Sequence, residues 1–241
     1  MRVLWVVLVP ALVSGCVFKE RTETESVEFT EPFERFTIDS DGGNVSLVGS
    51  ATTKATGEIT YRYDRARPEM VWSLQDDGEL LVTVDCAYED YLCEVELDVV
   101  IPSTTVTLID TRIGDIYAEN VVLTTTLDAR NGSIEAVDIG GDLTAAAGQG
   151  DVSAIGLTGR RIQVTAEDGE LTLDHDLSFD TIRADTGKGD VDVSVVDGRY
   201  NVVATATGGQ VAITGLTADT SVDTRIEAST GDGNITITGK P

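Results

Sequence analysis

A glycine-led pentapeptide recurs along the second half of this chain, and it constrains the fold more than any other feature. Seven copies begin at residues 114, 132, 150, 169, 189, 209 and 233: GDIYA, GSIEA, GDVSA, GELTL, GDVDV, GQVAI and GNITI. A repeat with a period near 20 residues is typical of architectures in which each unit stacks on the next. The sequence therefore predicts a stack of similar units rather than a globule.

Apolar and polar residues alternate on both sides of each glycine. Apolar residues lie two and four positions after it, as in Val191 and Val193, and three, five and often seven positions before it, as in Ile162 and Val164. A period of two indicates strands with one buried face. We therefore predict an all-β fold, a parallel β-helix or β-solenoid with two strands and a glycine corner in each coil of about 20 residues.

The same register appears once earlier, around Gly43, and the segment after it differs. Residues 52–104 contain EITYRYD, MVWSL, ELLVTVDC and CEVELDVVIP, which predict longer strands, and QDDG, which predicts a hairpin turn. We predict a signal peptide at 1–15, a linker at 16–25, an N-terminal β section with the first coil at 26–104, and solenoid repeats at 105–241.

The N-terminal stretch MRVLWVVLVPALVSGC predicts export and a lipid anchor. Its apolar run is shorter than the ~20 residues that a membrane span needs. The run ends in Val13-Ser14-Gly15-Cys16, which resembles the bacterial lipobox, and this resemblance implies a lipid on Cys16. An ordinary cleaved signal peptide is the alternative. We expect the protein to be attached to a membrane through Cys16, on the extracytoplasmic side of the cell envelope.

The remaining cysteines and the charge balance fit an exported protein. Cys86 and Cys93 are close in sequence, and an oxidising compartment favours a disulfide between them over two free thiols or a metal site. Acidic residues outnumber basic ones by 42 to 17, which gives a formal charge of −25. Such a surface repels nucleic acid and anionic lipid, so we predict neither as a partner.

Four features together resemble a bacterial family of unknown function described as putative adhesins. They are the lipobox, the early coil, the VELDVVIP strand and the repeated Gly-polar-aliphatic-x-aliphatic pattern, over roughly residues 26–239. The resemblance implies a β-solenoid exposed on the cell envelope. It implies no catalytic residues and no cofactor.

Corner carboxylates raise the question of calcium, which prefers six to eight oxygen ligands. Stacked coils would align the residues after the corner glycines in one outward ladder, and its acidic members are the candidate calcium ligands Asp115, Asp151, Glu170 and Asp190. The repeats only partly match a calcium-binding nonapeptide, so solvated corner residues are the favoured interpretation and no metal site is predicted. Asp174-His175-Asp176 and Asp76-Asp77 could suggest hydrolysis, but both lie at predicted turns and favour a surface position.

Aromatic residues concentrate in the N-terminal section and could bind a glycan or an envelope protein. The candidates are Tyr61, Tyr63, Trp72, Tyr88 and Tyr91, for which a role in capping the end of the coil stack is the alternative. We expect a non-enzymatic adhesin or binding scaffold; a carbohydrate-active enzyme and an accessory protein of envelope stress sensing are the other hypotheses. We expect a monomer, with end-to-end pairing through the last coil, GNITITGKP, as the alternative.

Overall fold

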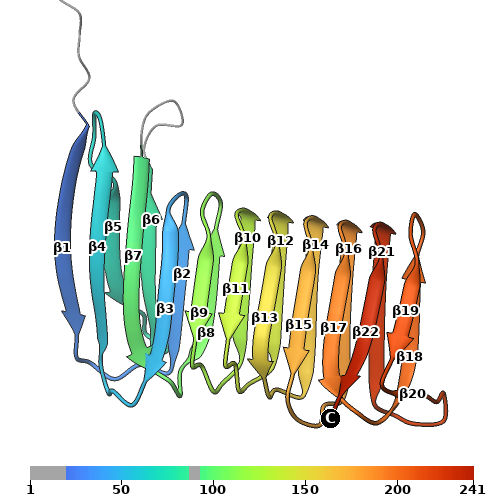
Figure 1. Ribbon diagram of the computed structural model, residues 1–241. Coiled ribbons are helices and arrows are strands. Elements are labelled where there is room, and N and C mark those ends of the chain that lie inside the picture. The colour runs from blue at the N-terminus through green and yellow to red at the C-terminus, as the bar shows by residue number, and fades with distance from the viewer. Residues whose placement is uncertain (1–19, 87–92) are drawn as a thin grey trace, which may run out of the picture.

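In the computed structural model, which describes residues 20–86 and 93–241, the chain forms 22 strands in two sheets of 11. The predicted all-β fold is confirmed, and the described ranges contain no helix that could cross a membrane. Figure 1 shows the two sheets lying face to face along one axis. The hydrophobic core of the described residues lies between them and runs from Phe36 to Ile237.

Sheet A contains, in spatial order, β1 (Arg21–Phe29), β4 (Ala55–Tyr63), β7 (Cys93–Pro102), β3 (Asn44–Ser50), β9 (Ile116–Glu119), β11 (Ile134–Val137), β13 (Val152–Leu157), β15 (Leu171–His175), β17 (Val191–Val196), β22 (Ile235–Lys240) and β19 (Val211–Thr214). Sheet B contains, from the opposite end, β20 (Thr217–Ala218), β18 (Arg199–Ala206), β21 (Arg225–Asp232), β16 (Thr181–Lys188), β14 (Arg161–Asp168), β12 (Leu143–Gln149), β10 (Thr125–Asn131), β8 (Val106–Thr111), β2 (Arg35–Ser40), β6 (Glu79–Asp85) and β5 (Glu69–Leu74).

Each glycine corner joins one strand of sheet B to one strand of sheet A, and we call such a pair a rung. Neighbouring rungs pair in parallel, for example β14 with β16 and β15 with β17. The predicted apolar rows point inward: Ile162, Val164, Val191 and Val193 are all buried. The pattern with a period of two therefore identified the buried face of these strands, because alternate side chains of a strand point to opposite sides of the sheet.

The corners require glycine because the backbones of successive rungs approach closely there. Gly189 has a φ of +125°, and a Cβ at this position would lie 2.2 Å from the carbonyl oxygen of Gly169. Gly233 has a φ of +155°, and a Cβ there would lie 2.0 Å from the carbonyl oxygen of Gly189. A side chain would meet both backbone strain and a steric clash.

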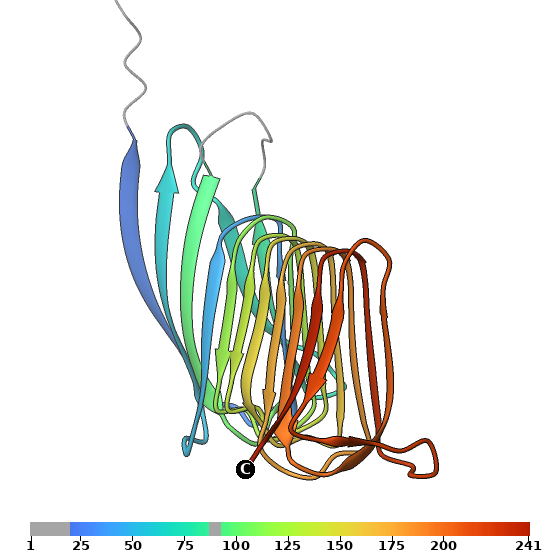
Figure 2. The same cartoon turned by 45° about the vertical axis from the view of Figure 1, so that its right-hand side comes forward.

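The last rung in the sequence is not the last rung in space. Strands β21 and β22 lie between β16/β17 and β18/β19, so residues 225–240 are inserted between two rungs that precede them in the chain. The prediction that GNITITGKP forms the open end of the stack is therefore wrong. Ile235 and Ile237 are fully buried, and β18/β19 forms the end instead (Figure 2).

A similar insertion occurs at the other end. The rung β2/β3 lies between β8/β9 and the pair β6/β7, whose strands follow it in sequence. Beyond β7, strands β4 and β1 add to sheet A in antiparallel orientation, and β5 adds antiparallel to β6 through the predicted QDDG turn. β1 begins at Arg21, inside the segment that was predicted as a linker. Figure 1 shows β1, β4 and β7 reaching beyond the level of the glycine corners.

Candidate functional site

The outer face of sheet A carries two rows of polar side chains across five strands, β7, β3, β9, β11 and β13. The first row begins with the register partners Glu96 and Asn44 and continues with the residues that directly precede β9, β11 and β13, each of which donates its N–H to the side chain before it in the row: Asp115, Ser133 and Asp151. Two residues further along each strand, the register aligns the second row: Asp98, Ser46, Tyr117, Glu135 and Ser153. Outward alternation in parallel strands thus builds a continuous polar surface from residues that are far apart in sequence.

These ten residues line a groove of about 490 Å³, which we call the sheet A groove. Five of its lining side chains are carboxylates, and none is Lys or Arg. A second hollow of about 580 Å³ continues from it over β7, β4 and β1, sharing Ser46 and Asp98. The groove is therefore rich in hydrogen-bond acceptors and negatively charged, which favours neutral polyhydroxylated or cationic ligands over anionic ones.

Tyr117 supplies the one aromatic ring among the residues that line this groove. Its hydroxyl donates a hydrogen bond to Glu119 Oε2 at 2.9 Å, and this bond raises the pKa of the Tyr117 hydroxyl. The ring is half-buried between neighbouring rungs. A fixed ring beside carboxylates is suited to packing against the apolar face of a sugar.

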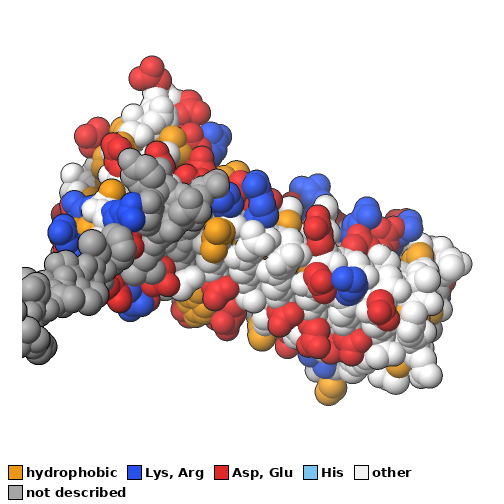
Figure 3. All heavy atoms as spheres, turned by 90° about the horizontal axis from the view of Figure 1, so that it is seen from above, with side chains coloured by type: hydrophobic (Ala, Val, Ile, Leu, Met, Phe, Trp, Pro, Cys, Tyr) orange, Lys and Arg blue, Asp and Glu red, His pale blue; other side chains and the backbone are white. Residues whose placement is uncertain are grey.

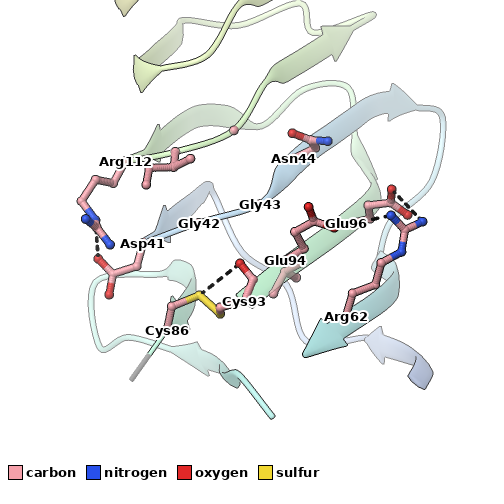
Figure 4. Close-up of a pocket in the computed structure, with 13 residues that line it drawn as sticks. Asp41, Gly42, Gly43, Asn44, Arg62, Cys86, Cys93, Glu94, Glu96 and Arg112 are labelled. Carbon is pink, nitrogen blue, oxygen red and sulfur yellow. Dashed lines mark hydrogen bonds and ion pairs between the residues drawn. A yellow bond between two sulfur atoms is a disulfide. The ribbon is translucent and has the colours of Figure 1, made fainter. Parts of the chain in front are cut away.

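A pocket of about 310 Å³ adjoins the groove where the tall N-terminal strands meet the glycine corners. It shares Asn44 and Glu96 with the groove, and the backbone of Gly42 and Gly43 forms part of its wall. The disulfide between Cys86 and Cys93, which the sequence predicted, forms another part of the wall (Figure 4).

Two arginines lie on opposite sides of this pocket in Figure 4. Arg62 contacts Glu94 and Glu96, with nitrogen–oxygen distances of 3.5 Å to each, and Arg112 Nε lies 3.6 Å from Asp41 Oδ1. Each guanidinium group is thus paired with carboxylates of the pocket itself. The pairs fix the wall of the pocket rather than leave a positive charge for an anionic ligand.

Three of the four corner residues that raised the question of calcium accept hydrogen bonds from the backbone of neighbouring rungs, and the fourth, Glu170, donates its own N–H. Asp115 Oδ1 accepts a hydrogen bond from the Ser133 N–H at 2.8 Å, and Asp151 Oδ1 accepts one from the Glu170 N–H at 2.8 Å. Asp190 Oδ1 likewise accepts from the Asn234 N–H at 2.7 Å. Within the described ranges, no group of three or more His, Cys, Asp or Glu side chains could hold a metal ion. The corner carboxylates therefore link successive rungs.

The predicted aromatic candidates do not form one exposed face. Tyr61 and Tyr63 are buried in the core, and burial raises the pKa of the Tyr61 hydroxyl. Their hydroxyls donate to Glu25 and Glu23 of β1. Trp72 is half-buried and packs on the ring of Phe36 with a centroid distance of 6.0 Å. Tyr88 and Tyr91 lie outside the described residues.

The residues that suggested hydrolysis serve structural roles. The predicted surface position is wrong for His175, which is the last residue of β15 and is fully buried. Its Nδ1 lies 2.9 Å from the Leu177 carbonyl oxygen and its Nε2 lies 2.7 Å from the Gly159 carbonyl oxygen. Asp174 and Asp176 both pair with Lys240. Asp77 lies in the β5–β6 turn and pairs with Arg35. Neither ring nitrogen of His175 is available to a substrate. Cys16, the predicted lipidation site, lies outside the described residues.

Sequence reasoning missed the groove residues Glu96, Asp98, Tyr117 and Glu135 as candidates. Their signal was present, because each occupies an outward position next to a buried aliphatic residue of its strand. This alternation could not identify a shared groove, because the sequence does not show which strands lie side by side. Glu96 and Tyr117 both border β3 only because the β2/β3 rung is inserted between strands that follow it in sequence.

No protein-family model and no curated protein matches the sequence. The fold is similar to a crystal structure of a putative adhesin from Bacteroides fragilis, with 13% sequence identity and a TM-score of 0.54; the match covers 89% of this chain and 97% of that chain. Two further matches have lower TM-scores. One is a putative lipid binding protein from Parabacteroides distasonis, with 10% identity, coverage of 89% and 96%, and a TM-score of 0.44.

The other is a putative cell adhesion protein from Clostridium sporogenes, with 14% identity, coverage of 92% and 100%, and a TM-score of 0.35. The predicted resemblance to the putative-adhesin family is thus confirmed at the level of the fold. The disulfide adds an independent indication of an extracellular or envelope location, since such bonds persist in oxidising compartments.

Proposed function

We propose that this protein is a non-enzymatic, lipid-anchored β-solenoid of the cell envelope that binds a glycan through the sheet A groove. The observation that supports this function is the pair of aligned polar rows with Tyr117 between carboxylates. Carboxylate, amide and hydroxyl side chains can accept and donate hydrogen bonds to sugar hydroxyls, and Tyr117 adds apolar contact. Successive rungs repeat these groups along the sheet, which suits a polymeric ligand.

The negative charge of the groove makes an anionic glycan an unfavourable ligand. Its five carboxylates, on a chain with a formal charge of −25, disfavour polymers of uronic acids or phosphates. We therefore expect the ligand to be a neutral glycan or one that carries amino groups.

Binding of residues 20–241 to immobilised neutral, amino-substituted and uronic-acid polysaccharides tests this function. We expect binding to the first two classes, and a loss of at least about tenfold in affinity for Tyr117→Ala, since an aromatic contact contributes on the order of 1.4 kcal/mol. Gln163→Ala, on the exposed face of sheet B, is the matched control and should bind as the wild type does. No binding to any polysaccharide, or equal binding by both variants, would contradict the proposal.

The absence of catalysis is tested with the same polysaccharides. We expect no new reducing ends after prolonged incubation, because Asp115 and Asp151 are engaged by backbone N–H groups and His175 is buried. Cleavage that is lost in Glu96→Gln would instead support the carbohydrate-active enzyme.

The lipid anchor is tested separately in cells. Cys16→Ser should abolish labelling by a fatty-acid analogue and leave the precursor uncleaved at this site. Labelling that persists in Cys16→Ser would refute the lipobox interpretation.

A further inference from the structure

The rung β18/β19 ends both sheets with unpaired strand edges. β19 pairs with β22 on one side only. β18 pairs with β21 on one side, and on the other it meets β20 only at Arg199 and Tyr200. The edge of β18 from Asn201 to Ala206 and the edge of β19 thus have no strand beside them in the described part of the chain. Such edges are templates for pairing with another strand.

The inward rows of the molecule are exposed at this end. Val211 and Ile213 are 41% and 40% exposed, although they occupy the same rows as Ile235 and Ile237, which are fully buried. On β18, Val202, Ala204 and Ala206 are only half-buried. The sequence continues the buried pattern up to the last rung, but no further rung of the described residues covers it.

This end also lacks charge. Residues 200–218, which include all of the rung except its first residue Arg199, contain no Asp, Glu, Lys, Arg or His. The flanking residues Arg199 and Asp219 pair with each other. Figure 3 shows white and orange surface at the tip of this end, whereas acidic side chains cover much of the rest. Two copies of so acidic a chain repel each other along their sides, but the ends themselves add no repulsion.

We infer that a second copy of this chain docks on the β18/β19 end, face to face, about a two-fold axis. Two-fold symmetry sets the paired edges antiparallel and lets each copy cover the exposed row of Val211 and Ile213 on the other. A charged partner would find no opposite charge to pair with on this edge. The same edge of a second copy is uncharged and apolar as well, so the two edges can pair without burying an unpaired charge.

The same geometry closes the assembly at two chains. The opposite end presents β5 in sheet B, which begins with Glu69, and β1 in sheet A, in which four of nine residues are charged: Arg21, Glu23, Glu25 and Glu28. Charged edges resist further pairing, so stacking does not continue into a fibre. The pair carries its two N-terminal ends at its far extremes. This inference is independent of the glycan proposed for the sheet A groove.

Sedimentation equilibrium of residues 20–241 tests the pairing. We expect a monomer–dimer equilibrium that tightens in ~0.5 M salt, because salt screens the remaining repulsion between the acidic sides. Ile213→Lys should raise the dissociation constant at least about tenfold, because lysines on facing edges repel. Thr172→Lys, which adds the same charge at an exposed position of β15 in the middle of sheet A, is the matched control and should leave dimerisation unchanged.

Disulfide cross-linking provides a second test that does not rely on an added charge. Ala212 is exposed on β19, and we expect Ala212→Cys to form a covalent dimer under mild oxidation, whereas Thr172→Cys stays monomeric. A monomer at both salt concentrations and high protein concentration would overturn the inference. Dimerisation that Ile213→Lys does not weaken, or cross-linking that is equal in both cysteine variants, would overturn it as well.

Discussion

The N-terminal and C-terminal ends of the two sheets are closed by different means. At the N-terminal end, the chain adds antiparallel strands, a disulfide and a cluster of aromatic rings. Arg67 lies 4.1 Å above the Tyr61 ring and pairs with Glu23 and Glu25 of the edge strand β1. At the C-terminal end, the rung β18/β19 keeps the repeat pattern, but beyond Arg199 it carries no charge, and no strand of the described residues covers its edge from Asn201 onward.

This difference shows that the repeat alone does not protect a sheet edge. Protection requires either charged residues on the edge or side chains that cover the exposed row. The N-terminal end has both, and the C-terminal end has neither in the described part of the chain.

The largest effect is expected when the same charge is introduced into the middle and at the open end of one row. Val191→Asp would place a carboxylate in the closed core, where no partner or solvent stabilises it, and should cost at least about 4 kcal/mol or prevent folding. Val211→Asp, in the same row but 41% exposed, should cost less than about 1 kcal/mol. Urea unfolding of both variants is the measurement. Equal losses of stability in the two variants would refute the conclusion that the row is open to solvent at Val211.

A smaller loss of folding stability is expected when the aromatic cluster at the N-terminal end is disrupted. Trp72 packs on Phe36, and its ring lies where a side chain on Gly57 would clash. Trp72→Ala should therefore cost about 2–4 kcal/mol, somewhat less than for a fully buried ring. Trp72→Phe should be nearly neutral, because the buried Nε1 of Trp72 has no hydrogen-bond partner to lose. Thermal unfolding of both variants would separate ring packing from the polar group.

The disulfide should contribute about 2 kcal/mol to the closed end, because it closes a short loop between β6 and β7. The double variant Cys86→Ser, Cys93→Ser should lose this amount in denaturant unfolding. Hydrogen exchange should rise in β6 and β7 and stay unchanged in β18 and β19. An equal rise at both ends would show that the bond does not act locally.

The smallest expected effect is the pH dependence of folding stability that Asp219 causes at the open end. Hydrogen bonds from the Ser221 hydroxyl and N–H, and from Arg199, lower the pKa of the Asp219 carboxyl from 3.8 to about 2. A carboxyl whose pKa is lowered on folding contributes stability above its unfolded pKa and loses it as pH falls through the folded value. Asp219→Asn should therefore be less stable than the wild type above about pH 4, and the difference should vanish by about pH 2. Melting temperatures across this range, with Asp192→Ala as a near-neutral control, measure it.

Within each rung, the sequence predicted the strands, the corner and the buried face. These features are local, since alternation and a glycine corner are properties of about ten consecutive residues. The same alternation places Tyr61 and Tyr63 on the side of Ile59, and all three are buried. The core position of these rings could therefore have been predicted from the sequence, because residues two apart in a strand share a face.

The order of the rungs was decided only by the tertiary structure. Rows such as Ile235/Ile237 and Val211/Ile213 are nearly interchangeable in shape and hydrophobicity, so the sequence does not specify which one covers the other. The chain between them, through Thr217–Ala218 and the turn around Asp219, is long enough for residues 225–240 to return and insert beside β16 and β17. Stacking contacts between rungs that are distant in sequence determine this order, and with it the sheet A groove and the uncharged open end.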